Sequence, residues 1–290
     1  MNNKFKSIAE LIFDSNTFKI KNITNNELII YNTNSRSKKV VELKLEKNNQ
    51  NSTITVYSIN KYQSFTGSYL LNKVKELSDR LKIKIYLDDS SVIRLKNYEL
   101  RKYCYYSLRT FHILSDGESW YNKYGFVSKD YELEKIHNYE LITMTLIDFI
   151  NSSLVLRKNK LEKSVTERYP SYWNSNLKLY RTDRRRYGKD LLELENKISK
   201  CKEYESYGDY LDYENEEILR RLLILPEILI ENDFNGESIV KDIMQFLKMH
   251  INQNIIKLNC NDPLIRWLIE FVTISDYSII YDNDLFYTPI

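Results

Sequence analysis

The sequence predicts an α+β fold in which a mixed, mostly antiparallel sheet with flanking helices is followed by a helical C-terminal region. Three observations predict it. Apolar and polar residues alternate in several segments of the first sixty residues, the period becomes helical at Gly67 and then returns to two, and only helical periodicity is found from about Glu132 onward. With 290 residues, of which 42% are hydrophobic, the chain has enough material for one large or two ordinary domains. We expect a first domain over 1–135 and a helical region over 136–290.

The first part of the chain contains four candidate strands. TFKIKNI alternates, ELIIY is rich in β-branched residues, VVELKLE alternates from Val40 to Glu46, and TITVYSI extends from Thr53 to Ile59. Short polar turns such as KNNQNS connect them. Successive strands joined by short turns predict an antiparallel meander.

A helix is expected from Gly67 to about Leu81, because its apolar residues recur at steps of three and four. A strand, KIKIYL, follows this helix, and Asp88 and Asp89 then begin a polar turn. The order strand, helix, strand predicts a crossover between two parallel neighbours. The apolar positions of the helix are Leu70, Leu71, Val74, Leu77 and Leu81.

The remaining elements are expected to be helices. Pro226 should interrupt one of them, and Asp262 should cap another that begins at Pro263. The predicted ranges are Tyr98–Leu114, Tyr139–Leu156, Leu191–Tyr204, Glu216–Leu229, Glu237–Ile251 and a helix after Asp262.

The net charge and the cysteine content bear on possible partners, disulfides and metal sites. The formal net charge of +3 neither requires nor excludes a polyanionic partner. Cys104, Cys201 and Cys260 lie far apart, with no CxxC pair and no histidine at metal-ligand spacing, so we expect no disulfide framework and no metal site. We recognise no signal peptide and no apolar run of membrane-spanning length, so a reduced, cytoplasmic location without a membrane partner is expected.

The stretch GESWYNKYGF, from Gly117 to Phe126, holds two of the six glycines in the chain. Between these glycines lie Trp120, Tyr121 and Tyr124. Gly125 fits a left-handed residue that ends a helical turn, because it has no Cβ that would clash. Phe126 would then begin a strand.

This order of elements resembles the acetyl-CoA half of the GNAT superfamily of N-acetyltransferases. YQSFTGSYLL lies where that family has its glycine-rich pyrophosphate loop and the helix that follows it, and YNKYGF matches the family's Tyr-x-x-x-Gly-Phe. Both segments lie within about residues 53 to 131. A form with Gly-x-Ser-Trp-Tyr before the second motif is familiar in acetyltransferase-like proteins of large DNA viruses. The resemblance implies a GNAT-like fold, acetyl-CoA as a substrate, and direct transfer of the acetyl group to an unidentified amine.

The resemblance also implies site residues. Gly67 aligns with the second glycine of the family loop, which puts Phe65 at the first glycine and Thr66 and Ser68 beside it. The N-terminus of a helix offers unpaired N–H groups and the positive end of its dipole to a pyrophosphate. Val56 and Ser58 match the strand residues whose backbone groups contact the pantetheine arm.

Tyr121 matches the family tyrosine that protonates the departing CoA thiolate. A phenol with a pKa near ~10 is neutral at working pH and can donate a proton to a thiolate whose pKa is near ~8.5. Two simpler readings stay open: Gly67 only opens a buried crossover helix, and Tyr121 is only a core aromatic. His112, His137 and His250 stand apart from any candidate serine or cysteine partner, and we expect them to be structural or exposed.

Two other functions compete with the enzyme. The first is a catalytically inactive GNAT-fold protein that serves as a structural or interaction component, with its helical C-terminal region binding a protein partner. No helices that could shape an acceptor pocket are predicted between Thr17 and Ile59, which favours this alternative, and its location would be the host cytoplasm or a virion if the source is viral. The second is nucleic-acid binding through the cluster Arg181–Arg186; a single short cluster in a near-neutral chain more often belongs to a solvated loop, so no nucleic-acid partner is expected.

Overall fold

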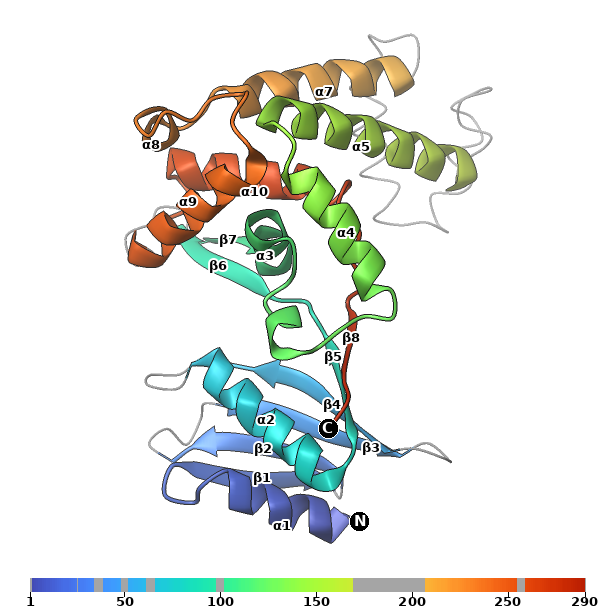
Figure 1. Ribbon diagram of the computed structural model, residues 1–290, viewed down its shortest axis with the longest axis vertical. Helices are drawn as coiled ribbons and strands as arrows, with labels where there is room; N and C mark the ends of the chain where they lie inside the picture. The colour runs from blue at the N-terminus through green and yellow to red at the C-terminus, as the bar shows by residue number, and fades with distance from the viewer. Residues whose placement is uncertain are drawn as a thin grey trace. The chain divides into compact units, whose positions relative to one another are not determined.

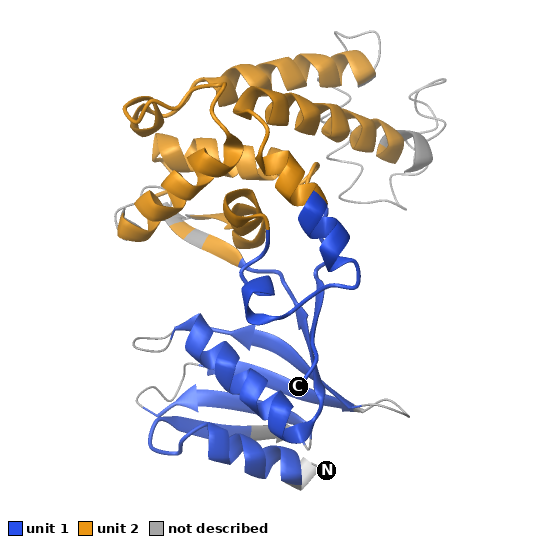
Figure 2. Ribbon diagram, in the orientation of Figure 1, with its two compact units in different colours: residues 1–91, 118–136, 280–290 blue, residues 92–117, 137–279 orange. Residues whose placement is uncertain are grey.

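The computed structural model describes residues 2–24, 26–33, 39–47, 52–60, 66–97, 102–168, 207–254 and 259–289. The chain divides into two compact units, which Figure 2 colours separately. Unit 1 combines residues 1–91, 118–136 and 280–290, and unit 2 combines 92–117 and 137–279. Both units are therefore discontinuous in sequence, whereas the sequence analysis expected two continuous segments.

Unit 1 contains a sheet whose strands lie in the order β1-β2-β3-β4-β5-β8 (Figure 1). All neighbours are antiparallel except β4 and β5, which are parallel. The prediction of a mixed, mostly antiparallel sheet that begins with a four-stranded meander is confirmed. The strands are β1 (Phe18–Thr24), β2 (Glu27–Asn32), β3 (Lys39–Lys47), β4 (Ser52–Ile59), β5 (Lys84–Asp88) and β8 (Asp284–Tyr287).

Two helices, α1 (Asn2–Ile12) and α2 (Gly67–Leu81), pack against one face of this sheet (Figure 1). The bounds of α2 agree with the prediction. Helix α1 was not predicted, although Phe5, Ala9 and Ile12 are buried at the three- and four-residue steps of a helix. The core between helices and sheet is formed by the alternate strand residues, among them Leu43, Leu45, Ile54, Val56, Ile85 and Leu87.

The last strand, β8, was not predicted. It pairs antiparallel with β5 and buries Leu285 and Tyr287 in the core of unit 1, while Asp284 is exposed. Four residues with one alternation are too short for a periodic signal, so the expectation of a purely helical C-terminal region is wrong here. Phe126 was expected to begin a strand; instead, the residue after it, Val127, forms an isolated bridge with Phe286.

Unit 2 begins with a hairpin, β6 (Val92–Asn97) and β7 (Lys102–Ser107), followed by α3 (Leu108–Asp116). The predicted helix Tyr98–Leu114 is therefore wrong over Lys102–Ser107, which form β7, and residues 98–101 lie outside the described residues. The run KYCYYS has apolar or aromatic residues at both spacings, so its period does not distinguish a strand from a helix. Ser107 ends β7 and caps α3, because its Oγ accepts a hydrogen bond of 3.1 Å from the backbone N–H of Thr110.

The rest of unit 2 is mainly helical, as predicted. Asp262 caps α10 by accepting a hydrogen bond of 2.9 Å from the N–H of Leu264, and Pro226 separates α7 from α8. The predicted helix Tyr139–Leu156 is divided between α4 and α5, and Leu191–Tyr204 lies outside the described residues. In the described part of the chain, no helix is long and apolar enough to span a membrane. The helices are α4 (Tyr131–Ile142), whose residues up to Ile136 belong to unit 1, α5 (Leu146–Arg168), α7 (Tyr207–Leu223), α8 (Glu227–Ile230), α9 (Val240–Asn254) and α10 (Pro263–Ser275).

A disulfide joins Cys104 in β7 to Cys260, which precedes α10. The expectation of no disulfide framework is therefore wrong for these two cysteines. They lie 156 residues apart, and spacing along the chain carries no information about a contact that only the folded unit creates. Cys201 lies outside the described residues. Among the residues that the structure describes, no group of three His, Cys, Asp or Glu side chains could hold a metal ion.

Candidate functional site

The candidate site lies in unit 1, at the C-terminal ends of the parallel strands β4 and β5. Because α2 connects these parallel strands, it begins near the C-terminal end of β4. The parallel ladder runs from Thr53–Lys84 to Val56–Leu87, whereas β4 continues to Ile59. Of the two predicted pantetheine contacts, Val56 is thus the last residue in the ladder, and Ser58 lies beyond it and is paired with Glu42 of β3.

The N-terminus of α2 is capped by Thr66, whose Oγ1 accepts a hydrogen bond of 3.1 Å from the N–H of Tyr69. The N–H groups of Gly67 and Ser68 belong to the first helical turn and have no acceptor within the helix. A helix end of this kind can bind an anion through its backbone alone. Phe65, the fourth residue predicted for this loop, lies outside the described residues.

The aromatic residues of the GESWYNKYGF stretch contact this helix end. A Cβ placed on Gly67 would lie 3.3 Å from Cη2 of Trp120, and the hydroxyl of Tyr124 donates a hydrogen bond of 2.6 Å to Oγ of Ser68. The ring of Trp120 lies 4.8 Å from that of Tyr124 and 4.9 Å from that of Tyr121, measured between centroids. The structure therefore brings together both segments that carry the GNAT resemblance.

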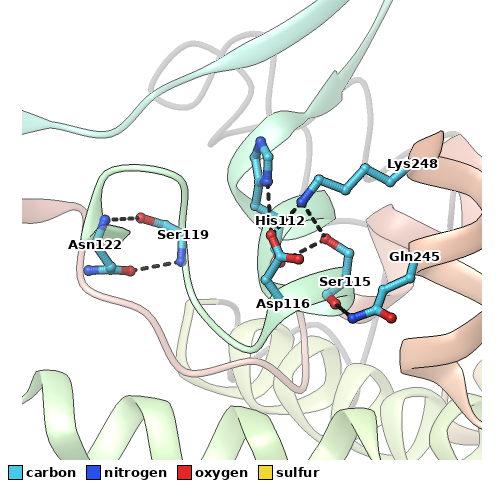
Figure 3. Close-up of polar contacts among 7 residues, drawn as sticks. All are labelled: His112, Ser115, Asp116, Ser119, Asn122, Gln245 and Lys248. Carbon is cyan, nitrogen blue, oxygen red and sulfur yellow. Dashed lines mark hydrogen bonds and ion pairs between the residues drawn. The ribbon is translucent and has the colours of Figure 1, made fainter. Parts of the chain in front are cut away.

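A pair of buried polar residues holds this aromatic turn. Asn122 Oδ1 accepts a hydrogen bond of 2.7 Å from the N–H of Ser119, and the N–H of Asn122 donates one of 3.4 Å to Oγ of Ser119 (Figure 3). The Asn122 amide also donates to the carbonyl of Phe126 at 2.9 Å. Gly125 has φ of 79°, which confirms the predicted left-handed residue. Ser119 and Asn122 were not predicted as site residues, although serine and asparagine three residues apart are typical of such local turns.

Tyr121 is packed against the sheet core, with its ring 6.2 Å from that of Phe126. Burial raises the pKa of Tyr121 above that of a free phenol, and the negative charge of Asp89 raises it further. The phenol consequently stays protonated at neutral pH and can act as a hydrogen-bond or proton donor.

Asp89 is a functional candidate that sequence reasoning missed, because it was read as part of a polar turn after β5. Its side chain is 1% exposed. One carboxylate oxygen accepts a hydrogen bond of 2.6 Å from Oγ of Ser91, and the other accepts one of 2.8 Å from the hydroxyl of Tyr281. A buried carboxylate at the end of β5 thus supplies the negative field around Tyr121.

Unit 2 contains a separate polar cluster between α3 and α9 (Figure 3). Asp116 lies 3.4 Å from Nδ1 of His112 and forms an ion pair with Lys248. Ser115 is buried, and its hydroxyl donates to the backbone carbonyl of His112 at 3.1 Å rather than to the imidazole. The cluster therefore has no serine–histidine nucleophile pair and joins two helices, in agreement with the expected structural use of His112.

Two other features were singled out in the sequence, His137 and the cluster Arg181–Arg186. Nε2 of His137 lies 3.2 Å from the carbonyl oxygen of Ser278. The cluster Arg181–Arg186 lies outside the described residues.

No protein-family model, no curated protein and no solved structure matches this chain.

Proposed function

We propose that this chain is a divergent GNAT-like N-acetyltransferase that uses unit 1 to transfer an acetyl group from acetyl-CoA to an amine. One observation carries the proposal: the first turn of α2 at Gly67 and Ser68, the part of β4 beyond its ladder with β5, and Tyr121 lie near one another where β4 and β5 end. This part of unit 1 offers an anion site, a stretch of β4 that is paired with β3 but not with β5, and a proton donor to one extended thioester.

Each of these parts has a stated task in the proposal. The N–H groups of Gly67 and Ser68 hold the pyrophosphate, and the backbone from Val56 to Ser58 contacts the pantetheine arm. The amine nitrogen attacks the thioester carbonyl, the C–S bond breaks, and the CoA thiolate takes the proton of Tyr121. The amine loses its own extra proton to solvent, and the Tyr121 phenolate regains a proton from solvent.

Binding is tested by thermal unfolding with and without acetyl-CoA. A ligand at about 100 times its Kd stabilises the folded state by about 2.7 kcal/mol, so the melting temperature should rise with concentration. Ser68→Asp should abolish this rise, because a carboxylate in the first turn suits the helix dipole but repels a pyrophosphate. Ser107→Asp, which adds the same charge at the start of α3 in unit 2, is the matched control and should keep the rise.

Transfer is tested by following the release of free CoA with a panel of amines. Tyr121→Phe should lower turnover by about 10²- to 10⁴-fold while leaving the acetyl-CoA-induced stabilisation nearly unchanged. Equal turnover by the wild type and this variant would remove Tyr121 from the mechanism.

A second candidate function is a non-catalytic GNAT-like protein that acts as a structural or interaction component. Trp120 packs on Gly67 and Tyr124 is bonded to Ser68, so these residues already have a use inside the fold. The melting temperature distinguishes the two functions: if millimolar acetyl-CoA leaves it unchanged, the non-catalytic function is the better one.

A further inference from the structure

The sheet of unit 1 has two edges that differ in their pairing. At the edge formed by β8, the N–H of Val127 donates a hydrogen bond of 2.9 Å to the carbonyl of Phe286, and the N–H of Phe286 donates one of 2.8 Å in return. At the opposite edge, β1 pairs with β2, and no described strand pairs with its outer side (Figure 1). The open edge of this sheet is therefore β1, a strand of 7 residues.

An open edge of this kind presents backbone groups in a regular row. In an antiparallel ladder, every second residue directs its N–H and C=O toward the neighbouring strand, and the residues between direct theirs away from it. The ladder between β1 and β2 runs from Phe18–Asn32 to Asn22–Leu28, so the outer side of β1 offers alternating donors and acceptors along this length. Such a row is a template for a further strand.

The side chains of β1 give its two faces different characters. Phe18 and Ile20 face the core between the sheet and the helices, where Ile20 is only partly buried. Lys19 and Lys21 are exposed and project from the opposite face, because side chains alternate along a strand. Neither lysine forms an ion pair within the part of the chain that the structure describes. The strand contains no acidic residue, so its exposed face is positively charged.

We propose that the outer edge of β1 binds an extended segment of another protein that alternates acidic and apolar residues. The backbone of this segment pairs with the outward N–H and C=O groups of β1 and adds a strand to the sheet. Residues directly opposite each other lie on the same face, so the acidic side chains of the partner lie beside Lys19 and Lys21. The apolar side chains of the partner lie on the other face and cover the remaining surface of Ile20.

A second copy of this chain fits the edge less well than an acidic partner does. If two copies of β1 paired antiparallel about Ile20, Lys19 of each copy would lie opposite Lys21 of the other. Like charges in directly opposite positions destabilise a pair of strands. Lysines on an edge strand are a common protection against such self-pairing, and the same charges attract a strand of opposite sign. The charge of β1 therefore selects an acidic partner.

The first experiment uses a fluorescein-labelled peptide of alternating Glu and Val, as long as β1. Its fluorescence anisotropy should rise with the concentration of the full-length protein, with a Kd below about 1 mM. Hydrogen exchange followed by mass spectrometry should show slower exchange in residues 18–24 when the peptide is bound, because outward N–H groups of β1 become hydrogen-bonded. The same peptide with an N-methyl group on every residue keeps its charge but has no N–H to donate, so it should not bind.

A charge exchange tests the side chains separately from the backbone. Lys19→Glu/Lys21→Glu should weaken binding of the Glu/Val peptide by about tenfold or more, because two attractive cross-strand pairs become repulsive. This variant should instead bind a peptide of alternating Lys and Val. Lys84→Glu/Lys129→Glu makes the same change of charge at two other exposed positions of unit 1 and should bind the Glu/Val peptide like the wild type. Circular dichroism and the melting temperature of each variant verify that it folds.

Four results would overturn the proposal. The first is no binding of the Glu/Val peptide at a protein concentration of about 1 mM. The second is equal binding by the wild type and by Lys19→Glu/Lys21→Glu. The third is slower exchange on peptide binding only outside β1. The fourth is a dimer of the wild type in light scattering whose formation protects residues 18–24, which would assign the edge to a second copy. None of the residues proposed for acetyl-CoA binding lies in β1, so the outcome is independent of that function.

Discussion

Trp120 lies so close to Gly67 that a Cβ at position 67 would require the indole to shift by a few tenths of an ångström. A Cβ on Gly67 would lie 3.3 Å from Cη2 and 3.6 Å from Cζ2 of the indole. The glycine thus allows an aromatic residue from a distant segment to pack on the first turn of α2, and this contact joins the two halves of the candidate site.

Gly67→Val is expected to destabilise the protein by about 1–3 kcal/mol, because its methyl groups would overlap the indole of Trp120. Chemical denaturation monitored by tryptophan fluorescence and circular dichroism measures the change. In a Trp120→Leu background the same substitution should be less damaging, since the smaller side chain leaves space. Additive effects of the two substitutions would contradict the contact.

Tyr121 should make the stability of the protein fall at alkaline pH. Burial raises the folded-state pKa of Tyr121, whereas the unfolded phenol ionises near ~10, so above that pH the unfolded state binds fewer protons than the folded state. The resulting stabilisation is fully present below pH ~10 and is lost as the pH rises toward the folded-state pKa, at up to about 1.4 kcal/mol per pH unit. Urea denaturation from about pH 9 to 11 should show a smaller decline for Tyr121→Phe than for the wild type. Identical declines would show that the phenol is solvated in the folded state.

Glu134→Gln is expected to increase the stability of unit 1 at neutral pH. The Glu134 side chain is buried, accepts hydrogen bonds from Ser128 Oγ at 2.8 Å and from the N–H of Asp282 at 3.0 Å, and has a pKa raised mainly by burial. A raised carboxyl pKa means that the stability is highest at acid pH and falls as the pH rises through the folded-state value. Glutamine keeps the acceptor for Asp282 and carries no charge, so the variant should lose this pH dependence. A variant that is less stable than the wild type at pH 7 would contradict the expectation.

Loss of the Cys104–Cys260 disulfide should lower the free energy of unfolding by about 2–5 kcal/mol, because the bond closes a long loop in the unfolded chain. Differential scanning calorimetry should show a lower melting temperature for Cys104→Ala/Cys260→Ala. A reductant should lower the melting temperature of the wild type and leave that of the double variant unchanged. Equal responses to the reductant would show that the two cysteines are not bonded to each other.

The part of the fold that repeats a simple period could be predicted from the sequence. The meander β1–β4 and the bounds of α2 follow from alternation and from three- and four-residue steps, and Asp262 and Pro226 mark helix ends through local chemistry. The hairpin β6–β7 could not be predicted, since KYCYYS suits a strand and a helix equally. Strand β8 could not be predicted either, because its place in the sheet depends on a partner, β5, that is remote in the chain.

The parts of the candidate site that depend on backbone conformation could be predicted from the sequence. The start of α2 was predicted from the change of period at Gly67, and the left-handed residue at Gly125 from its lack of a Cβ; both are confirmed. Asp89 was missed because a carboxylate after a strand resembles any polar turn, and only the folded unit shows it buried against Ser91 and Tyr281. The disulfide was missed for the same reason: contact between remote residues has no local signal.

Strand β8 also has a consequence for biosynthesis. It completes the edge of the N-terminal sheet beside β5, yet the ribosome makes it only after all of unit 2 has been translated. Until then β5 has an unpaired edge, and Leu285 and Tyr287 are missing from the core. The nascent first unit therefore lacks its last strand while unit 2 is being synthesised. A ribosome stalled before codon 284 would leave β5 as an exposed, aggregation-prone edge strand that a chaperone could recognise.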